Sequence, residues 1–159
     1  MIDRARANRR IAAVATIGLA LLAHAPAVAE PGPALPDGFV VRVPDQIVWQ
    51  SAGADGIEFA LLYGNPSQPG LYIMRVRFPA NTMSRPHTHD QDRFVTVIEG
   101  TWHAGTQASF DPAETIPLPA GSFMIHPAGA VHYDGARDAP TIVEIRGIGP
   151  VQTSYLPKP

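Results

Sequence analysis

The feature that most limits the fold is a series of short apolar runs that turn-forming residues interrupt at close intervals. The chain of 159 residues contains 17 prolines and 14 glycines, and we find no convincing amphipathic helix in it. Runs of Val, Ile, Phe and Tyr between such breaks are typical of short strands. The pattern therefore predicts an all-β domain, either an antiparallel sandwich or a barrel.

The apolar runs give the expected strands and the turns between them. Strands are predicted at residues 39–43, 47–50, 57–63, 71–78, 93–98, 101–104, 122–126 and 141–146. One helical turn is expected at residues 111–115, and Glu99 with Gly100 is expected to form a hairpin turn. Residues 151–159 are interpreted as a loose C-terminal tail.

The first 29 residues have the composition of a secretory signal peptide. Four arginines lie within the first ten residues, an apolar run follows at 11–23, and Ala27-Val28-Ala29 has the small residues that signal peptidase recognises. The apolar run is too short to span a bilayer comfortably, so we expect cleavage before Glu30 and no stable membrane anchor afterwards. An uncleaved anchor is the alternative. The predicted location is the periplasm or the cell exterior, by a Sec or twin-arginine route that the sequence leaves open.

The remaining chain is expected to form one domain. Residues 30–37 are a proline-rich lead-in and residues 38–150 hold the predicted β-barrel, a length sufficient for a buried core. Without the charged residues of the signal peptide, the formal charge changes from −2 to −5. This acidic balance argues against a nucleic-acid partner. The absence of cysteine from the sequence excludes thiol chemistry and cysteine-based zinc sites.

Two histidines one residue apart stand before the strand predicted at 93–98. In extended chain, alternate side chains share a face, so His87 and His89 are expected to point into the same space. A third histidine, His132, follows the turn Pro127-Ala128-Gly129. Imidazoles that converge on one point are well suited to bind a divalent metal.

These histidines lie in two segments that resemble the sequence motifs of the cupin superfamily. The stretch PANTMSRPHTHDQDRFVTVIEG matches the first motif at His87, His89 and Gly100. The stretch GSFMIHPAGAVHY matches the second motif at Gly121, Pro127, Gly129 and His132. The resemblance is closest to small single-domain bacterial cupins, and it implies an antiparallel jelly roll, also called a double-stranded β-helix barrel. It also implies that His87, His89 and His132 bind iron, manganese, nickel, copper or zinc; histidines without a metal are the alternative.

The sequence departs from the first motif at Arg93, where most metal-binding cupins have a glutamate or glutamine ligand. A guanidinium stays protonated in proteins and cannot bind a cation. Three interpretations remain open. The metal is held by three histidines while Arg93 pairs with an anionic substrate; Gln91 or Asp92 supplies a fourth ligand through a local bulge; or the cavity binds a small ligand without a metal. Asp92 is also a candidate to hold Arg93 in place.

Two hypotheses about function follow from this site. The first is a metal-dependent dioxygenase-like enzyme or isomerase in which Arg93 orients a small organic molecule. The second is a non-catalytic domain that binds a small ligand or a metal, and the fold class hosts both kinds of protein. His103 and His126 are expected outside the direct ligand set. A homodimer is expected by analogy with other small cupins, because exposed sheet edges favour pairing.

Overall fold

The computed structural model describes residues 36–53 and 55–157. The predicted signal peptide at 1–29, and all but the end of the predicted lead-in at 30–37, lie outside these residues. The chain divides into two compact units, Met1–Phe39 and Val40–Pro159. In the described part of the first unit, the amide of Phe39 donates to the carbonyl of Pro36. Within the described residues, no helix is long and apolar enough to cross a membrane.

The described residues of the second unit form strands and two single-turn 3₁₀ helices, in agreement with the predicted all-β class. The 3₁₀ helices are η1 (Pro44–Gln46) and η2 (Pro112–Glu114). The strands are β1 (Gln50–Ser51), β2 (Glu58–Tyr63), β3 (Gly70–Phe78), β4 (Thr82–Met83), β5 (His87–His89), β6 (Arg93–Glu99), β7 (Thr101–Gly105), β8 (Ile116–Pro119), β9 (Phe123–His126), β10 (Tyr133–Ala136), β11 (Thr141–Gly149) and β12 (Thr153–Tyr155).

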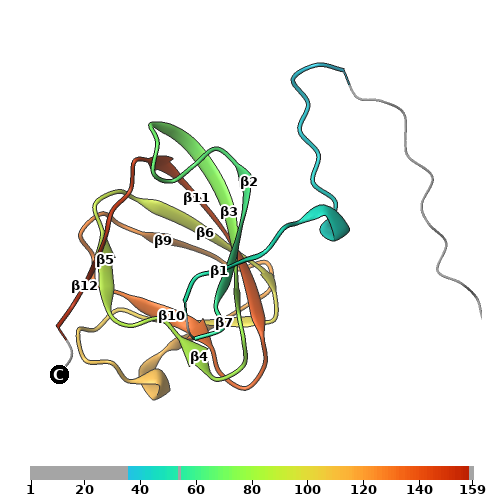
Figure 1. The fold of residues 1–159 in the computed structure, drawn as a ribbon. Helices are drawn as coiled ribbons and strands as arrows, with labels where there is room; N and C mark the ends of the chain where they lie inside the picture. Colours follow the sequence, from blue (N-terminus) through green and yellow to red (C-terminus); the bar gives the residue numbers. More distant parts are fainter. Residues whose placement is uncertain (1–35, 54, 158–159) are drawn as a thin grey trace, which may run out of the picture. The chain divides into compact units, whose positions relative to one another are not determined.

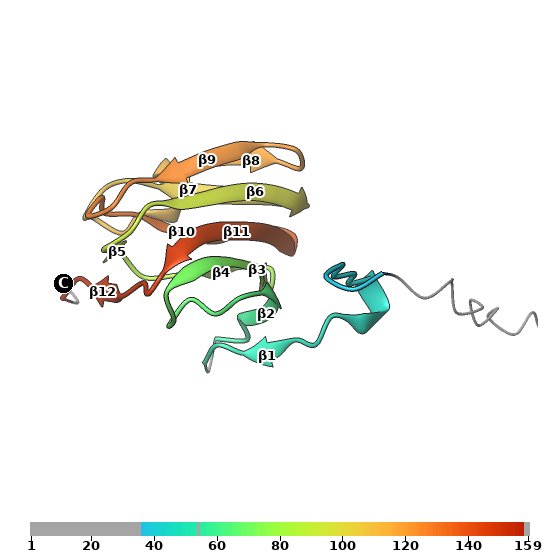
Figure 2. The same ribbon diagram turned by 90° about the horizontal axis from the view of Figure 1, so that it is seen from above.

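The strands form three antiparallel sheets (Figure 1). One sheet has six strands in the order β1-β2-β3-β11-β6-β9, a second has four in the order β4-β10-β7-β8, and the third pairs β12 with β5. Figure 2 shows the six-stranded order directly, with β9, β6, β11, β3, β2 and β1 in succession. Strands distant in sequence are neighbours in this topology, as expected for the jelly-roll barrel that the sequence predicted.

Side-chain alternation along the strands separates an inner face from an outer face. On β11, residues Thr141, Val143 and Ile145 are buried, while the residues between them are more exposed. The buried core draws Tyr72, Val95 and Val143 from the six-stranded sheet and Trp102, Ala104 and Ala136 from the four-stranded sheet. The hydrophobic core therefore lies between the inner faces of these two sheets.

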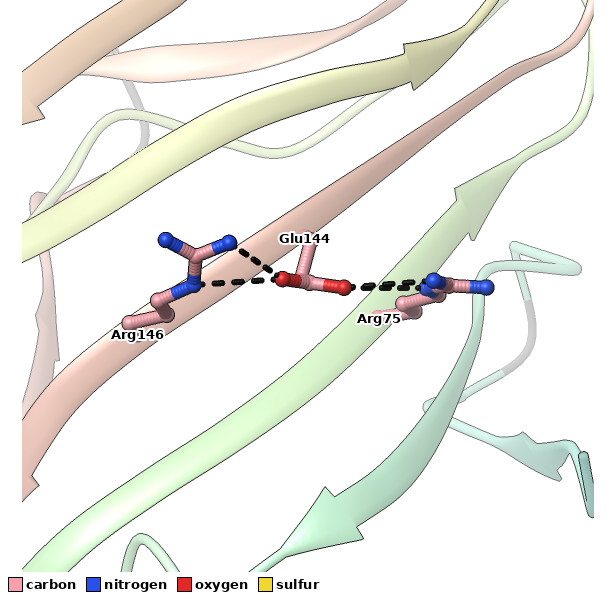
Figure 3. A network of polar contacts seen from close by, with 3 residues as sticks. All are labelled: Arg75, Glu144 and Arg146. Carbon is pink, nitrogen blue, oxygen red and sulfur yellow. Dashed lines mark hydrogen bonds and ion pairs between the residues drawn. The ribbon is translucent and has the colours of Figure 1, made fainter. Parts of the chain in front are cut away.

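The outer face of the six-stranded sheet carries paired charges. Glu144 on β11 accepts hydrogen bonds from two arginines, with Arg75 Nε at 3.2 Å and Arg146 Nη2 at 2.7 Å (Figure 3). On the neighbouring strands, Arg77 pairs with Glu58. Each of these outward arginines has a carboxylate partner.

Three of the predicted strands and turns differ from the structure. Residues 39–43 form no strand, although they are apolar, and residues 47–50 contribute only Gln50 to β1. Apolar composition does not supply the hydrogen-bonded neighbour that a strand requires. Gly100 does not close a hairpin, because β6 and β7 belong to different sheets. With φ of +74°, it turns the chain between those sheets, where a Cβ would clash with the carbonyl oxygen of Pro140.

The C-terminal segment also differs from the predicted loose tail. Residues Thr153–Tyr155 form β12, which pairs antiparallel with the histidine strand β5. Thr153 is opposite His89 and Tyr155 is opposite His87. Figure 1 shows the two strands side by side. The sequence did not predict this pairing, because the paired residues are 64 to 68 positions apart and three residues carry little periodic signal.

Candidate metal centre

The two histidine motifs meet at one place in the fold. His87 and His89 lie on β5 with one residue between them, and backbone hydrogen bonds join His87 to His132 in both directions. One nitrogen from each of the three imidazoles lies within 4.8 Å of the others, and the three side chains are buried. The ring centroids are 4.3 to 5.1 Å apart. We call His87, His89 and His132 the cavity trio.

Main-chain carbonyls orient two rings of the cavity trio. His87 Nδ1 is 2.6 Å from the carbonyl oxygen of Arg85, and His132 Nδ1 is 3.0 Å from that of Ala130. A carbonyl only accepts, so each Nδ1 must carry the hydrogen, and the lone pair lies on Nε2. Among the described residues, Nε2 of His132 has no hydrogen-bond partner although it is buried. This tautomer is the one in which Nε2 is free to bind a metal.

The third ring, His89, contacts Arg93. A guanidinium nitrogen of Arg93 lies 2.5 Å from Nε2 of His89, while Nδ1 of His89 faces the hydroxyl of Thr153 at 3.0 Å. The guanidinium only donates, so His89 accepts at Nε2 and donates from Nδ1 to Thr153. The Nε of Arg93 is buried and has no partner within the described part of the chain. Arg93 thus engages the nitrogen that His89 would offer to a metal.

Burial favours the neutral form of His89, His126 and His132. Desolvation, aided by the charge of Arg93, lowers the pKa of His89 from 6.5 to about 3. Desolvation and the neighbouring His132 lower the pKa of His126 to about 2. The pKa of His132 is also lowered by burial, although the carboxylate of Asp134 acts in the opposite direction. Neutral imidazole is the form that binds metals.

Neither residue proposed as a replacement for the missing glutamate reaches the trio. Gln91 and Asp92 are exposed, and the carboxylate of Asp92 accepts a hydrogen bond from the amide of Ala128 at 2.8 Å. Asp92 therefore stabilises the turn after β9, and it makes no ion pair with Arg93 among the described residues. Gln91 and Asp92 are also not among the residues that line the cavity beside the trio, so the structure gives no support to the interpretation that placed a fourth ligand here.

A cavity of 480 Å³ opens beside the trio. His87, His89 and Arg93 form its polar side, with Ser84, Arg85 and Thr153 nearby. Its apolar wall consists of Ile57, Phe59, Met74, Val76, Phe78 and Ile145. An apolar cavity with a few convergent polar groups is the usual form of a small-molecule site.

Sequence reasoning gave less weight to three residues near the trio. His126, at the end of β9, is 4% exposed, and its ring lies 3.8 Å from that of His132. Asp134 on β10 is buried and faces the same interior, and Thr153 contacts His89. Two-residue spacing from His132 is the signal that would have indicated Asp134. His103 lies apart on β7, where Nδ1 contacts the Thr115 hydroxyl at 3.2 Å.

The donor set fits a divalent transition metal. The observation that supports this fit is the buried Nε2 of His132, which has no partner in the described structure and is directed by a carbonyl bond at Nδ1. Imidazole nitrogens satisfy the common preference of zinc, iron, nickel and copper. The contact between Arg93 and His89 opposes binding, because a metal and a guanidinium hydrogen compete for one lone pair.

Comparison with known proteins places this chain in a family. The sequence model of the ChrR cupin-like domain matches residues 37–152, and the chain belongs to that family within the cupin superfamily. No curated protein matches the chain.

Solved structures support the same fold at low sequence identity. The polyketide cyclase RemF from Streptomyces resistomycificus has a TM-score of 0.59 and 17% identity, covering 76% of this chain and 89% of RemF. A sugar phosphate isomerase of the cupin superfamily from Silicibacter pomeroyi has a TM-score of 0.55 and 22% identity, covering 72% and 80%. The Rhodobacter sphaeroides complex of SigE with the anti-sigma ChrR contains a chain with a TM-score of 0.52 and 18% identity, covering 67% and 52%.

Proposed function

We propose that this protein is an exported metal-dependent cupin enzyme, an oxygenase or isomerase that acts on a small anionic organic molecule. The observation that supports this most is the convergence of one nitrogen from each of His87, His89 and His132 to within 4.8 Å of the others, beside a cavity. A divalent ion of iron, manganese, nickel, copper or zinc fits these imidazoles. Such an ion would supply Lewis acidity or redox chemistry when bound.

In this proposal, Arg93 binds the anionic group of the substrate. Its guanidinium lines the cavity, its Nε has no partner in the described structure, and it forms no ion pair there. A planar guanidinium binds a carboxylate through two parallel hydrogen bonds. The apolar wall, with Phe59 and Met74, would hold the body of the molecule and exclude water from the polar side. Binding of the anion would also draw Arg93 away from Nε2 of His89.

The proposal is tested by elemental analysis of the purified chain. We expect about one metal ion per chain in the wild type and none in His132→Ala. His103→Ala is the matched control, because His103 lies outside the cavity and its loss is expected to leave the metal content unchanged. A wild-type protein that takes up no divalent metal, as isolated or after incubation, would overturn the proposed function.

A second function is favoured by one contact. Because Arg93 donates to Nε2 of His89, the site as it stands also suits a domain that binds a small anion without a metal or catalysis. The solved neighbours do not separate the two functions, since they include a cyclase, an isomerase and a complex with an anti-sigma protein. A metal-free wild type that still binds small carboxylates would favour this second function.

We also propose export to the periplasm or cell exterior and assembly as a homodimer. Export is supported by the composition of residues 1–29. The dimer is supported by exposed apolar side chains on β6 and β9, of which β9 is the edge of its sheet: Phe94, Ile98, Phe123 and Ile125. N-terminal sequencing of the exported protein and sedimentation of the purified chain test the two statements.

A further inference from the structure

A second group of possible metal ligands lies beside the cavity trio. One ligand atom from each of His126, His132 and Asp134 lies within 4.8 Å of the others, and the three side chains are 4%, 2% and 8% exposed. We call these residues the inner group. They come from the end of β9, the turn that follows it, and β10. Two histidines and one carboxylate form the donor set that commonly holds iron(II) and that zinc also accepts.

The polar atoms of the inner group are poorly satisfied in the described structure. Nε2 of His126 and Nε2 of His132 are both buried without a hydrogen-bond partner. The carboxylate of Asp134 accepts one long hydrogen bond, from the hydroxyl of Ser84 at 3.3 Å, and forms no ion pair with a described arginine or lysine. A buried carboxylate without a cation is costly, and so are buried nitrogens without partners. A single cation between the three ligands would satisfy all of them.

The charges around the two groups differ. In the cavity trio, the guanidinium of Arg93 engages Nε2 of His89 and no carboxylate is present. Arg93 is also the neighbour of His126 across β6 and β9, so its charge acts on both groups. In the inner group, however, Asp134 supplies a negative charge that offsets it. Coulomb attraction therefore favours a cation more strongly in the inner group.

Both groups depend on the same atom of His132. The Nδ1 of this ring donates to the carbonyl of Ala130, so only Nε2 has a lone pair to offer. We propose that His126, His132 and Asp134 form a second binding position for a divalent transition metal, which alternates with the position in the cavity trio. The inference rests on the proposed function, because it takes the cavity trio as one metal position and His132 as a ligand of both positions. It predicts one ion per chain, held at either of two neighbouring positions.

The test is a Co²⁺ and Zn²⁺ titration of the chelator-treated full chain, followed by absorption spectroscopy and calorimetry. His89→Ala, which removes a ligand from the cavity trio alone, is expected to bind one ion per chain with a Kd raised less than about tenfold. Adding Asp134→Asn to His89→Ala is expected to raise the Kd more than about 100-fold, beyond the effect typical of a residue outside the coordination sphere. If the variant with Asp134→Asn does not fold, His126→Gln is combined with His89→Ala instead. The same rise in Kd is expected for that double variant.

The possible outcomes separate the inference from the proposed function. If His89→Ala alone abolishes binding while its circular dichroism matches the wild type, the inner group is not a metal site, and the cavity trio stands. If the double variants of His89→Ala bind as tightly as the single variant, the inference is also wrong. If the wild type binds neither Co²⁺ nor Zn²⁺, both the inference and the proposed function are wrong. His103→Ala is the matched control and is expected to leave both the affinity and the Co²⁺ spectrum unchanged.

Discussion

The arginines on the two faces of the six-stranded sheet differ in whether they have a carboxylate partner. On the outer face, Arg75, Arg77 and Arg146 each pair with a glutamate, and Glu144 serves two of them (Figure 3). On the inner face, Arg93 has no carboxylate partner among the described residues, and it donates instead to Nε2 of His89. The outer ion pairs are near solvent, where such pairs contribute little to stability.

The difference indicates which face is adapted to bind a ligand. A partly buried cation without an anion is unfavourable for stability, so the presence of Arg93 beside a cavity points to a partner from outside the chain. The buried nitrogens without hydrogen bonds follow the same division, since His126 and His132 both belong to the interior. The outer face has its charges satisfied, whereas the inner face leaves donors and acceptors available.

The largest expected effect concerns the pH dependence of the metal-free protein. Burial lowers the pKa of His126 to about 2 and of His89 to about 3, and it also lowers the pKa of His132. The unfolded chain therefore binds more protons below pH 6.5, and the free energy of unfolding falls as the pH decreases through this range. His89 and His126 are each expected to contribute a loss of about 2 kcal/mol between pH 7 and pH 5.

Urea unfolding with a chelator present measures this loss of stability. Two variants compare the contributions of the inner face and the outer face to the pH dependence. His126→Gln is expected to reduce the pH dependence by about one histidine's share, since it removes a buried base. Glu144→Gln, on the outer face, is expected to leave the dependence between pH 7 and pH 5 nearly unchanged. A wild-type stability that stays constant over this range would contradict the assignment of neutral buried histidines.

The next largest effect is expected from Arg93→Glu. The change removes the cation that engages His89 and places a carboxylate where many cupins have one, so metal affinity is expected to rise more than about 100-fold, or about 3 kcal/mol. Competition with a chromophoric chelator measures the change. Arg93→Gln is expected to give a smaller gain, and Arg75→Gln, its outer-face control, is expected to give none. An unchanged affinity in Arg93→Glu would show that Arg93 does not control the site.

The smallest effect is expected on the outer face. Glu144→Gln leaves Arg75 and Arg146 without their shared carboxylate, and we expect a loss of about 1 kcal/mol in the free energy of unfolding at pH 7. Because these groups are partly exposed, raising the salt concentration should reduce the difference from the wild type. A loss of several kcal/mol in the free energy of unfolding that does not respond to salt would contradict the statement that the outer ion pairs contribute little to stability.

The sequence predicted those parts of the site that depend on local spacing. The one-residue spacing of His87 and His89 places both on one side of β5, and alternation along β6 puts Arg93 on the same side as Val95 and Val97. The motif around Gly129 indicated the position of His132. The sequence could not predict that Thr153 would contact His89, because this contact joins residues 64 positions apart. The two-residue spacing from His132 indicated that Asp134 could share its face, but the sequence could not show that Asp134 lies near His126.

The sequence by itself therefore determined the all-β class, the inward histidines and the place of an arginine where a carboxylate is common. These follow from residue type and from the two-residue period of a strand, which act over a few positions. Only the tertiary structure decided that Arg93 contacts His89, that Asp92 belongs to a turn and that β12 covers β5. Such contacts depend on sheet order and strand register, which are set by packing across the whole domain.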